Sequence, residues 1–298
     1  MPMRIAVTGA SGMVGTALTA HLRGRGDEVL RLVRRPVRAP DEVSWDPPSR
    51  RLDPADLAGV DALVHLAGAG PSDHRWTPAY QHELLTSRID GTTTVATALA
   101  ALGSPVRLVS QSAIGYYGDR GDLELTEDSG PGEGFVPEMV KAWEASADPA
   151  REAGLSVAHP RTGLVFSRGA GALGRMVPLA RLGINGPLGS GRQWWSWLSL
   201  HDAVAALAHL VDHPEVVGPV NVVSPEPTRQ RDVARVLGEV LHRPAVLPAP
   251  GFGVRLVLGG FADEVLTSKR VSAQRLVGTG FTHRDTDLGA LLRTELGS

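Results

Sequence analysis

Three glycines recur at every third position near the start of the chain, at Gly9, Gly12 and Gly15. The apolar run 4–8 before them predicts a buried strand, and residues 16–23 after them predict a helix. Glycine lacks a Cβ, so its backbone can turn tightly and approach a ligand, and a helix N-terminus offers free N–H groups to a pyrophosphate. We interpret the segment as a dinucleotide-binding turn of the T-G-x-x-G-x-x-G type, the alternative being an ordinary strand-to-helix turn. The expected cofactor contacts in this turn are Thr8, Gly9, Ser11, Gly12, Met13, Val14 and Gly15.

The next strand, expected over 28–33, ends in Arg34 and Arg35. Enzymes that use NAD usually carry an acidic residue here, which binds the ribose 2′-hydroxyl. An acid would repel a 2′-phosphate, whereas a guanidinium group pairs with one through charge-assisted hydrogen bonds. The two arginines therefore favour NADP(H) over NAD(H). The alternative is that they only reflect a chain rich in arginine, whose only lysines are Lys141 and Lys269.

Strand-like and helix-like runs alternate through the first half of the chain. Residues 61–66, 106–110 and 156–159 indicate strands, and residues 79–102 and 135–153 indicate helices. This alternation predicts an α/β fold, a Rossmann-type doubly wound parallel sheet with helices on both faces and a smaller C-terminal substrate lobe.

Residues 1–163 are expected to form the NADP-binding core. Residues 164–298 are expected to supply mainly a substrate-facing segment and the small C-terminal lobe, with a late strand near 219–223 returning to the core. Ligands of such sheets bind outside the carboxyl ends of the strands. The cofactor is therefore also expected beside the end of the strand over 61–66, at His65, Leu66, Ala67 and Gly68.

Composition narrows the classes of function. The chain has 298 residues, 42% of them hydrophobic and 21% charged, with a net charge of −2. This balance is typical of a soluble globular protein and gives no reason to expect a nucleic-acid or membrane partner. There is no cysteine, and the ten histidines lack the spacing of a helical metal site, so no metal is expected. No long apolar run or signal peptide is evident, which favours a cytoplasmic location.

A second motif, Ser112-Ala-Ile-Gly-Tyr116-Tyr117-Gly118, follows the strand over 106–110. Together with the glycine turn and His65–Gly68, it resembles the extended short-chain dehydrogenases/reductases, which include nucleotide-sugar epimerases and dehydratases. The resemblance implies a serine, here Ser112, that hydrogen-bonds the substrate oxygen. It also implies a Tyr-x-x-x-Lys pair, whose tyrosine exchanges a proton and whose lysine binds the nicotinamide ribose and lowers the phenol pKa.

This chain departs from that pattern. Lys141 stands on the expected helix, but Pro137 stands four positions earlier, and proline has no acid–base group. The chain instead resembles the SDR39U1-like or YfcH-like epimerase family of unknown substrate, including its short C-terminal domain over 241–281. That resemblance rests on Trp45-Asp46-Pro47, Arg75-Trp76-Thr77, Ser87-Arg88-Ile89, Trp143-Glu144, Arg161-Thr162-Gly163, the stretch 186–193 and His201-Asp202.

The missing tyrosine leaves the catalytic roles open. One hypothesis is that Ser112 and either Tyr116 or Tyr117 orient and protonate a substrate carbonyl while Lys141 fixes the ribose. The alternative is that the two tyrosines only line the pocket. The sequence does not show which residue replaces the tyrosine.

The substrate contacts are open as well. In nucleotide-sugar members of the superfamily, an arginine that clamps the substrate pyrophosphate is expected near Trp195, with Arg192 three residues earlier. The tryptophan could stack a planar substrate or belong to the core of the lobe. Arg75 and Arg161 are candidate anion clamps, the alternative being surface or helix-end pairing.

Three functions are consistent with these residues. The first is an NADP(H)-dependent oxidoreductase or epimerase-like enzyme that acts on a small molecule through hydride transfer. The others are a nucleotide-sugar epimerase or dehydratase and a non-catalytic NADP(H)-binding sensor or scaffold. The resemblance also implies a homodimer formed through the helices over 79–102 and 135–153.

Overall fold

A computed structural model describes residues 2–168 and 171–297 of the chain. Its centre is an eight-stranded sheet. The strands are β1 (Arg4–Thr8), β2 (Glu28–Val33), β3 (Glu42–Ser44), β4 (Ala62–His65), β5 (Arg107–Ser110), β6 (Ser112–Ala113), β8 (Val157–Thr162) and β12 (Gly218–Val222).

All strand pairs of this sheet are parallel, in the order β12-β8-β5-β4-β1-β2-β3, and β6 pairs with the end of β8. The direction of winding reverses between β1 and β4, which is the place where doubly wound folds bind nucleotides. The predicted Rossmann-type α/β fold is confirmed. β12 lies at the edge of the sheet although it follows the other strands by more than fifty residues, so the chain returns to the core after entering the C-terminal lobe.

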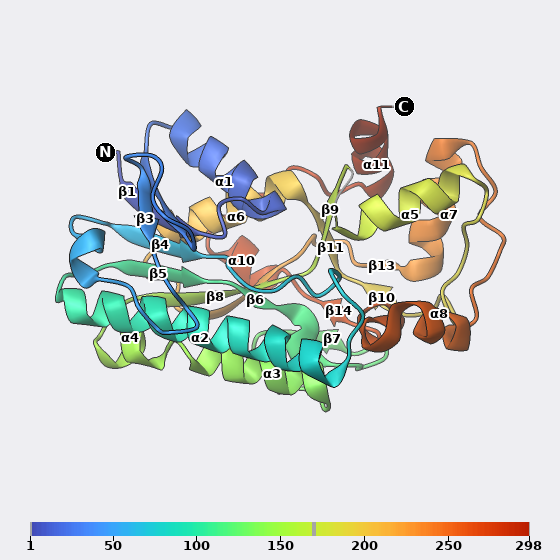
Figure 1. Ribbon diagram of the computed structural model, residues 1–298. Coiled ribbons are helices and arrows are strands. Elements are labelled where there is room, and N and C mark those ends of the chain that lie inside the picture. The colour runs from blue at the N-terminus through green and yellow to red at the C-terminus, as the bar shows by residue number, and fades with distance from the viewer. Residues whose placement is uncertain (1, 169–170, 298) are drawn as a thin grey trace.

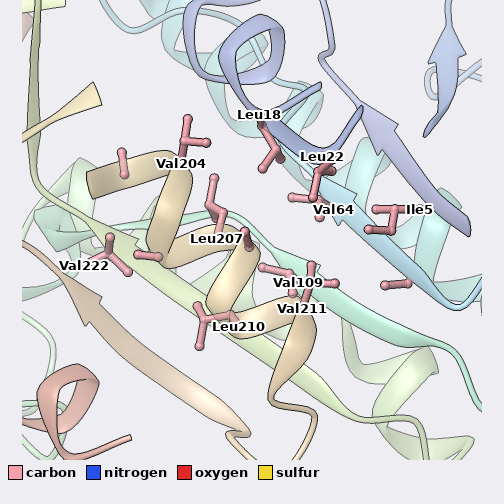
Figure 2. Packing of buried hydrophobic residues seen from close by; sticks show 14 of the residues in the cluster. Ile5, Leu18, Leu22, Val64, Val109, Val204, Leu207, Leu210, Val211 and Val222 are labelled. Atoms are coloured by element: carbon pink, nitrogen blue, oxygen red, sulfur yellow. The ribbon is translucent and has the colours of Figure 1, made fainter. Parts of the chain in front are cut away.

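Helices cover both faces of the sheet (Figure 1). Successive side chains of a strand point to opposite faces. Ile5 and Val7 of β1 therefore belong to one core cluster with Leu18, Leu22 and Leu207, while Ala6 joins the core on the other face. Figure 2 shows Ile5 and the leucines of this cluster between the sheet and its helices. The first face carries α1 (Met13–Gly24), α6 (Leu200–Asp212) and α10 (Gln274–Gly278), and the second carries η1 (Pro54–Leu57), α2 (Pro78–Leu102), α3 (Phe135–Ala145) and α4 (Asp148–Glu152).

The prediction of a single helix over 135–153 is wrong. The chain forms α3 and α4 instead, with Ser146 ending α3 and Pro149 in the first turn of α4. Proline has no N–H to donate and its ring clashes with the carbonyl four residues back, so it fits the first turn of a helix and disturbs a helix interior.

The C-terminal lobe has its own core, which includes Phe166, Trp195, Trp197 and Leu237. A two-stranded parallel ladder of β9 and β11 joins the lobe to the sheet, and β14 pairs with β7 from the first half of the chain. The elements outside the central sheet are β7 (Glu124–Leu125), β9 (Leu164–Ser167), α5 (Gly171–Arg181), β10 (Trp194–Trp195), β11 (Trp197–Ser199), β13 (Thr228–Arg229), α7 (Gln230–Leu241), α8 (Gly251–Leu258), η3 (Gly259–Phe261), α9 (Ala262–Leu266), β14 (Arg270–Val271) and α11 (Leu288–Leu296).

Asp202 in the first turn of α6 fastens the C-terminal tail to the core. Its buried carboxylate accepts hydrogen bonds from the backbone N–H groups of Arg284, at 3.0 Å, and Asp285, at 2.9 Å. Ser199 caps α6 by accepting the N–H of Asp202 at 3.0 Å. Among the described helices, none combines the length and apolar character needed to cross a membrane.

Candidate functional site

The glycine turn between β1 and α1 is shaped for close backbone packing. Gly9 has a φ of +66°, and a Cβ there would lie 2.9 Å from the backbone nitrogen of Ala67. A Cβ on Gly15 would lie 2.1 Å from the carbonyl oxygen of Gly9. No side chain of the described residues caps the start of α1 and its first turn holds no acid, so the positive end of the helix is open to an anion at Ser11, Met13 and Val14. The N–H of Gly12 donates to the carbonyl of Gly9 at 3.0 Å.

Thr8 and His65 lie behind this turn and are buried. Thr8 Oγ1 accepts the backbone N–H groups of Leu66, at 2.9 Å, and Ala67, at 3.1 Å, and it lies 2.8 Å from Nδ1 of His65. With both acceptor positions in use, the threonine hydroxyl donates to the imidazole. Burial lowers the pKa of His65 to about 3, so the ring is neutral. The structure therefore gives these two residues a positioning role instead of the cofactor contact expected from the sequence.

The two arginines after β2 differ in their surroundings. Arg35 makes a bidentate ion pair with the buried carboxylate of Glu42, at 2.7 and 2.8 Å, and this partner holds the pKa of Glu42 at about 2. The Arg34 side chain is exposed and makes no hydrogen bond or ion pair with any residue from 2–168 or 171–297. Arg34 is thus the arginine available to a 2′-phosphate, while Arg35 neutralises the acid beside it.

A cleft of about 360 Å³ opens at the carboxyl ends of the strands. One wall is the start of α1, at Val14, together with the loop after β4, at Leu66, Ala67 and Gly68. Ser112 and Trp143 line the cleft from the other side of the switch point. Its further lining residues are Ala69, Gly70, Pro71, Arg88, Gln111, Ala113, Thr162, Gly163, Val165, Ala203 and Leu207.

Ser112 belongs to a buried charged network. Its hydroxyl donates to Oε1 of Glu144 at 2.6 Å, and Arg161 on β8 holds both oxygens of that carboxylate at 2.8 Å. Burial alone would raise the pKa of Glu144, but the pairing with Arg161 and Ser112 lowers it on balance. Because the Arg161 side chain is 3% exposed and already paired, the prediction that it clamps a substrate anion is wrong.

The two tyrosines lie in the short helix η2 (Ile114–Tyr117), and neither lines the cleft. Tyr117 is fully buried; it donates to Asn221 at 2.7 Å and accepts from Arg161 at 3.1 Å. Burial raises its pKa to about 12. Tyr117 therefore does not serve as the proton donor proposed from the sequence. Tyr116 is half-buried, with its ring centroid 3.5 Å from the guanidinium carbon of Arg161.

Lys141 does not occupy the place expected of a ribose-binding lysine. It is exposed on α3, on the same face as Glu138 and Ala145, and it is absent from the lining of the cleft. Val140 and Trp143 cover the buried face of the helix instead. One residue turns a helix by about 100°, so the position after a buried valine leaves the core.

The other residues predicted to contact the substrate lie outside this cleft. Trp195 is buried and donates from Nε1 to the carbonyl of Val265 at 3.1 Å, so it packs the lobe and is not a platform for a substrate. Arg192 is exposed, and Arg75 is an exposed residue whose side chain lies over Gly259. None of the three lines the cleft.

Arg88 is the functional candidate that sequence reasoning missed. It is buried on α2 and lines the cleft, with its guanidinium carbon 5.0 Å from the ring centroid of Trp143. A signal was present, because Leu84, Arg88, Val95 and Leu99 share the buried stripe of the helix. An arginine in such a stripe indicates a cation turned into the protein.

Among residues 2–168 and 171–297, one group of side chains has the spacing of a metal site: His201, Asp202 and Asp285. Both oxygens of Asp202 already accept backbone N–H groups. We assign no metal to this group.

Comparison with known proteins identifies the family to which the glycine turn and most of the chain belong. Residues 5–224 match the NAD dependent epimerase/dehydratase family, and residues 249–295 match a domain of unknown function, DUF1731. An epimerase family protein of Mycobacterium bovis is 38% identical over 289 residues, which cover 97% of this chain and 96% of that protein.

Two solved structures share both the fold and about a third of the residues. The human epimerase family protein SDR39U1, crystallised with NADPH, is 32% identical with a TM-score of 0.88, over 99% of each chain. A nucleoside-diphosphate sugar epimerase from Corynebacterium glutamicum is 32% identical with a TM-score of 0.83, over 100% of this chain and 59% of that one.

Proposed function

We infer the function of this chain from its membership of the NAD-dependent epimerase/dehydratase family, to which it belongs over residues 5–224. Within that family it is an SDR39U1-like extended short-chain dehydrogenase/reductase. We propose that it is an NADP(H)-dependent oxidoreductase or epimerase-like enzyme that acts on a small molecule by hydride transfer. The observation that carries this proposal is one cleft that is lined by Val14 at the start of α1 and by Ser112. Arg34, which follows β2 and pairs with no residue of the described ranges, supports NADP(H) as the cofactor.

The residues present fit a dinucleotide phosphate. The glycines let the turn pack directly against the backbone at Ala67 and Gly9, which sets the position of the start of α1, and that helix start would hold the pyrophosphate. Arg34 would pair with the 2′-phosphate, because Arg35 has already neutralised Glu42. When bound, such a cofactor supplies or accepts a hydride at carbon.

Ser112 would hold the reacting oxygen of the substrate, and Glu144 would hold Ser112. The Ser112 hydroxyl donates to Glu144, so its oxygen is free to accept a hydrogen bond from a substrate hydroxyl. Glu144 stays ionised, because Arg161 and Ser112 lower its pKa. On oxidation of an alcohol, Ser112 would orient the substrate O–H, whose proton passes to water as the hydride leaves carbon. Reduction of a carbonyl runs the same transfer backwards. Tyr116 and Lys141 have no part in this scheme.

We expect Arg34→Ala to weaken NADPH binding about 10- to 100-fold while changing NADH binding less than about twofold, since it removes one charge-assisted contact to the 2′-phosphate. The measurement is calorimetric titration of both nucleotides. Arg235→Ala, an exposed arginine on α7, is the matched control and should leave both affinities unchanged. Equal losses for NADPH and NADH in Arg34→Ala would contradict the assignment.

A second expected result concerns Ser112. In any reaction found by screening carbonyl compounds for NADPH oxidation, Ser112→Ala is expected to lower kcat by about 100-fold or more, because the group that orients the reacting oxygen is gone. Tyr117→Phe should keep at least about half of the wild-type kcat, since that hydroxyl is turned into the core. The reverse ranking of the two variants would return the role to the tyrosine.

Two other functions have specific support. The resemblance to a nucleoside-diphosphate sugar epimerase favours a nucleotide-sugar substrate. The proline at position 137 and the exposed Lys141 favour a non-catalytic NADP(H)-binding sensor or scaffold. Retention of bound cofactor through turnover of a sugar nucleotide would establish the former, and NADPH binding with no turnover of any screened compound would establish the latter.

A homodimer is also part of the proposal. The extended short-chain dehydrogenase/reductase resemblance is its support, and α2 and α3 are the helices that would pair. Sedimentation of the purified protein tests it, with a monomer as the opposing result.

A further inference from the structure

Arg88 is a buried cation without a carboxylate partner. Its residue is 7% exposed, and it forms no ion pair within residues 2–168 and 171–297. Nη1 donates to the carbonyls of Ala69, at 3.1 Å, and Leu84, at 2.9 Å, while the buried Nε has no hydrogen-bond partner among the described residues. Burial lowers the pKa of Arg88 to about 10, so the guanidinium stays charged at neutral pH. Burying an unpaired charge destabilises the folded protein, unless a ligand or another charged group pairs with it.

Arg107 shows how this chain satisfies a buried arginine that serves only the fold. All three of its nitrogens donate: Nε to Leu210, Nη1 to Ser156 and Pro214, and Nη2 to Val216. In Arg88 a single nitrogen carries both hydrogen bonds found in the described part of the chain. Nη2 makes no hydrogen bond within the described ranges and is therefore available to a ligand, whereas Nε is covered by protein.

The open donors belong to a residue of the cleft. Arg88 lines it together with Ser112 and Trp143, and it is the single cation among the described lining residues, none of which is acidic. The backbone of Gly68 lies against the guanidinium, where a Cβ would stand 3.8 Å from Nη1. A buried guanidinium with an open N–H donor pairs favourably with a carboxylate through a charge-assisted hydrogen bond.

We propose that Arg88 binds the carboxylate of a small hydroxy acid or oxo acid whose reacting oxygen lies at Ser112. This inference rests on the proposed function, since it names the class of substrate for that site. A single guanidinium suits one carboxylate better than a substrate pyrophosphate, which carries more charge. The pyrophosphate of the cofactor would bind at the start of α1. A phosphate of the cofactor is the other anion that would pair with Arg88, and the experiment distinguishes it from a substrate carboxylate.

The test compares small carboxylates with their neutral amides on protein saturated with NADP⁺. Thermal unfolding is followed with acetate, glycolate and malonate, and with acetamide, glycolamide and malonamide, at one ionic strength. At least one acid is expected to raise Tm by about 1 to 3 °C while its amide does not. Arg88→Gln should abolish that shift, Arg88→Lys should keep part of it, and the control Arg235→Gln should keep all of it.

Calorimetric titration of Arg88→Gln with NADPH shows whether Arg88 binds a substrate carboxylate or a phosphate of the cofactor. A dissociation constant within about threefold of wild type supports a substrate carboxylate. A loss of about tenfold or more assigns Arg88 to the cofactor and overturns the proposal. The absence of any acid-specific shift in the wild-type protein also overturns it, even if Arg88→Gln fails to fold. Failure of the wild type to bind NADPH is a separate result, which would overturn the proposed function itself.

Discussion

Replacing Gly15 with alanine is expected to lower NADPH affinity by at least about 100-fold, or nearly 3 kcal/mol of binding free energy. The added Cβ would lie 2.1 Å from the Gly9 carbonyl oxygen and 2.8 Å from Cα of Ala10. Both neighbours are backbone atoms, so no side chain can rotate out of the way. The start of α1 must move away from the turn, and the N–H groups that face the pyrophosphate move with it.

Gly24→Ala is the matched control for Gly15→Ala. It makes the same substitution at the other end of α1, where a Cβ would have no neighbour within 4 Å. Alanine is a better helix former than glycine, so this variant should bind NADPH like wild type and unfold at the same temperature or a higher one. Calorimetry and thermal unfolding of both variants check the prediction. Wild-type affinity in Gly15→Ala would mean that the turn does not cradle the cofactor.

The second large effect concerns stability. Glu144→Gln is expected to lower the free energy of unfolding by about 3 to 5 kcal/mol at neutral pH, because it leaves a buried arginine without its counter-charge. The Arg161 side chain is 3% exposed and binds both oxygens of Glu144. Chemical denaturation measures the loss. Glu239→Gln on α7 removes the acid from an exposed Arg235–Glu239 pair and should cost less than about 1 kcal/mol.

The effect of Glu144→Gln has a defined pH dependence. The folded protein lowers the pKa of Glu144, so the carboxylate stabilises the fold above its ordinary pKa, and this contribution is lost as the pH falls through the lowered value. The difference between wild type and Glu144→Gln should therefore be largest near neutral pH and shrink below about pH 4. A difference that stays constant with pH would point to lost packing instead of lost charge.

Local sequence predicted the parts of the site that depend on neighbouring residues. The glycine turn, the strands beside it and the Rossmann-type sheet follow from hydrophobic runs and from glycine spacing, which act within about ten residues. The confirmed Rossmann-type architecture was predictable because strands alternate with helices along the chain, which favours a parallel sheet covered by helices. Placing Arg34 at the end of β2 used the same local reasoning.

Contacts between distant residues were beyond that reasoning. Arg161 and Glu144 are separate in sequence, and nothing local shows that a strand and a helix bring them together, so the arginine looked free. Lys141 was assigned because it stands on the expected helix, but the burial of Val140 turns the lysine to solvent. Trp195 carries no sign of whether its indole faces a ligand or the core of the lobe. Arg88 could have been found, because it interrupts the apolar stripe of a long helix.

The most direct test of the account is the affinity of the unmodified protein for NADPH and NADH, measured by calorimetry at one salt concentration. We predict that both nucleotides bind and that NADPH binds at least about tenfold more tightly, because only it carries the phosphate that Arg34 faces. Tighter binding of NADH would contradict the cofactor assignment. No binding of either nucleotide would contradict the enzyme function and leave a family fold that has lost its chemistry.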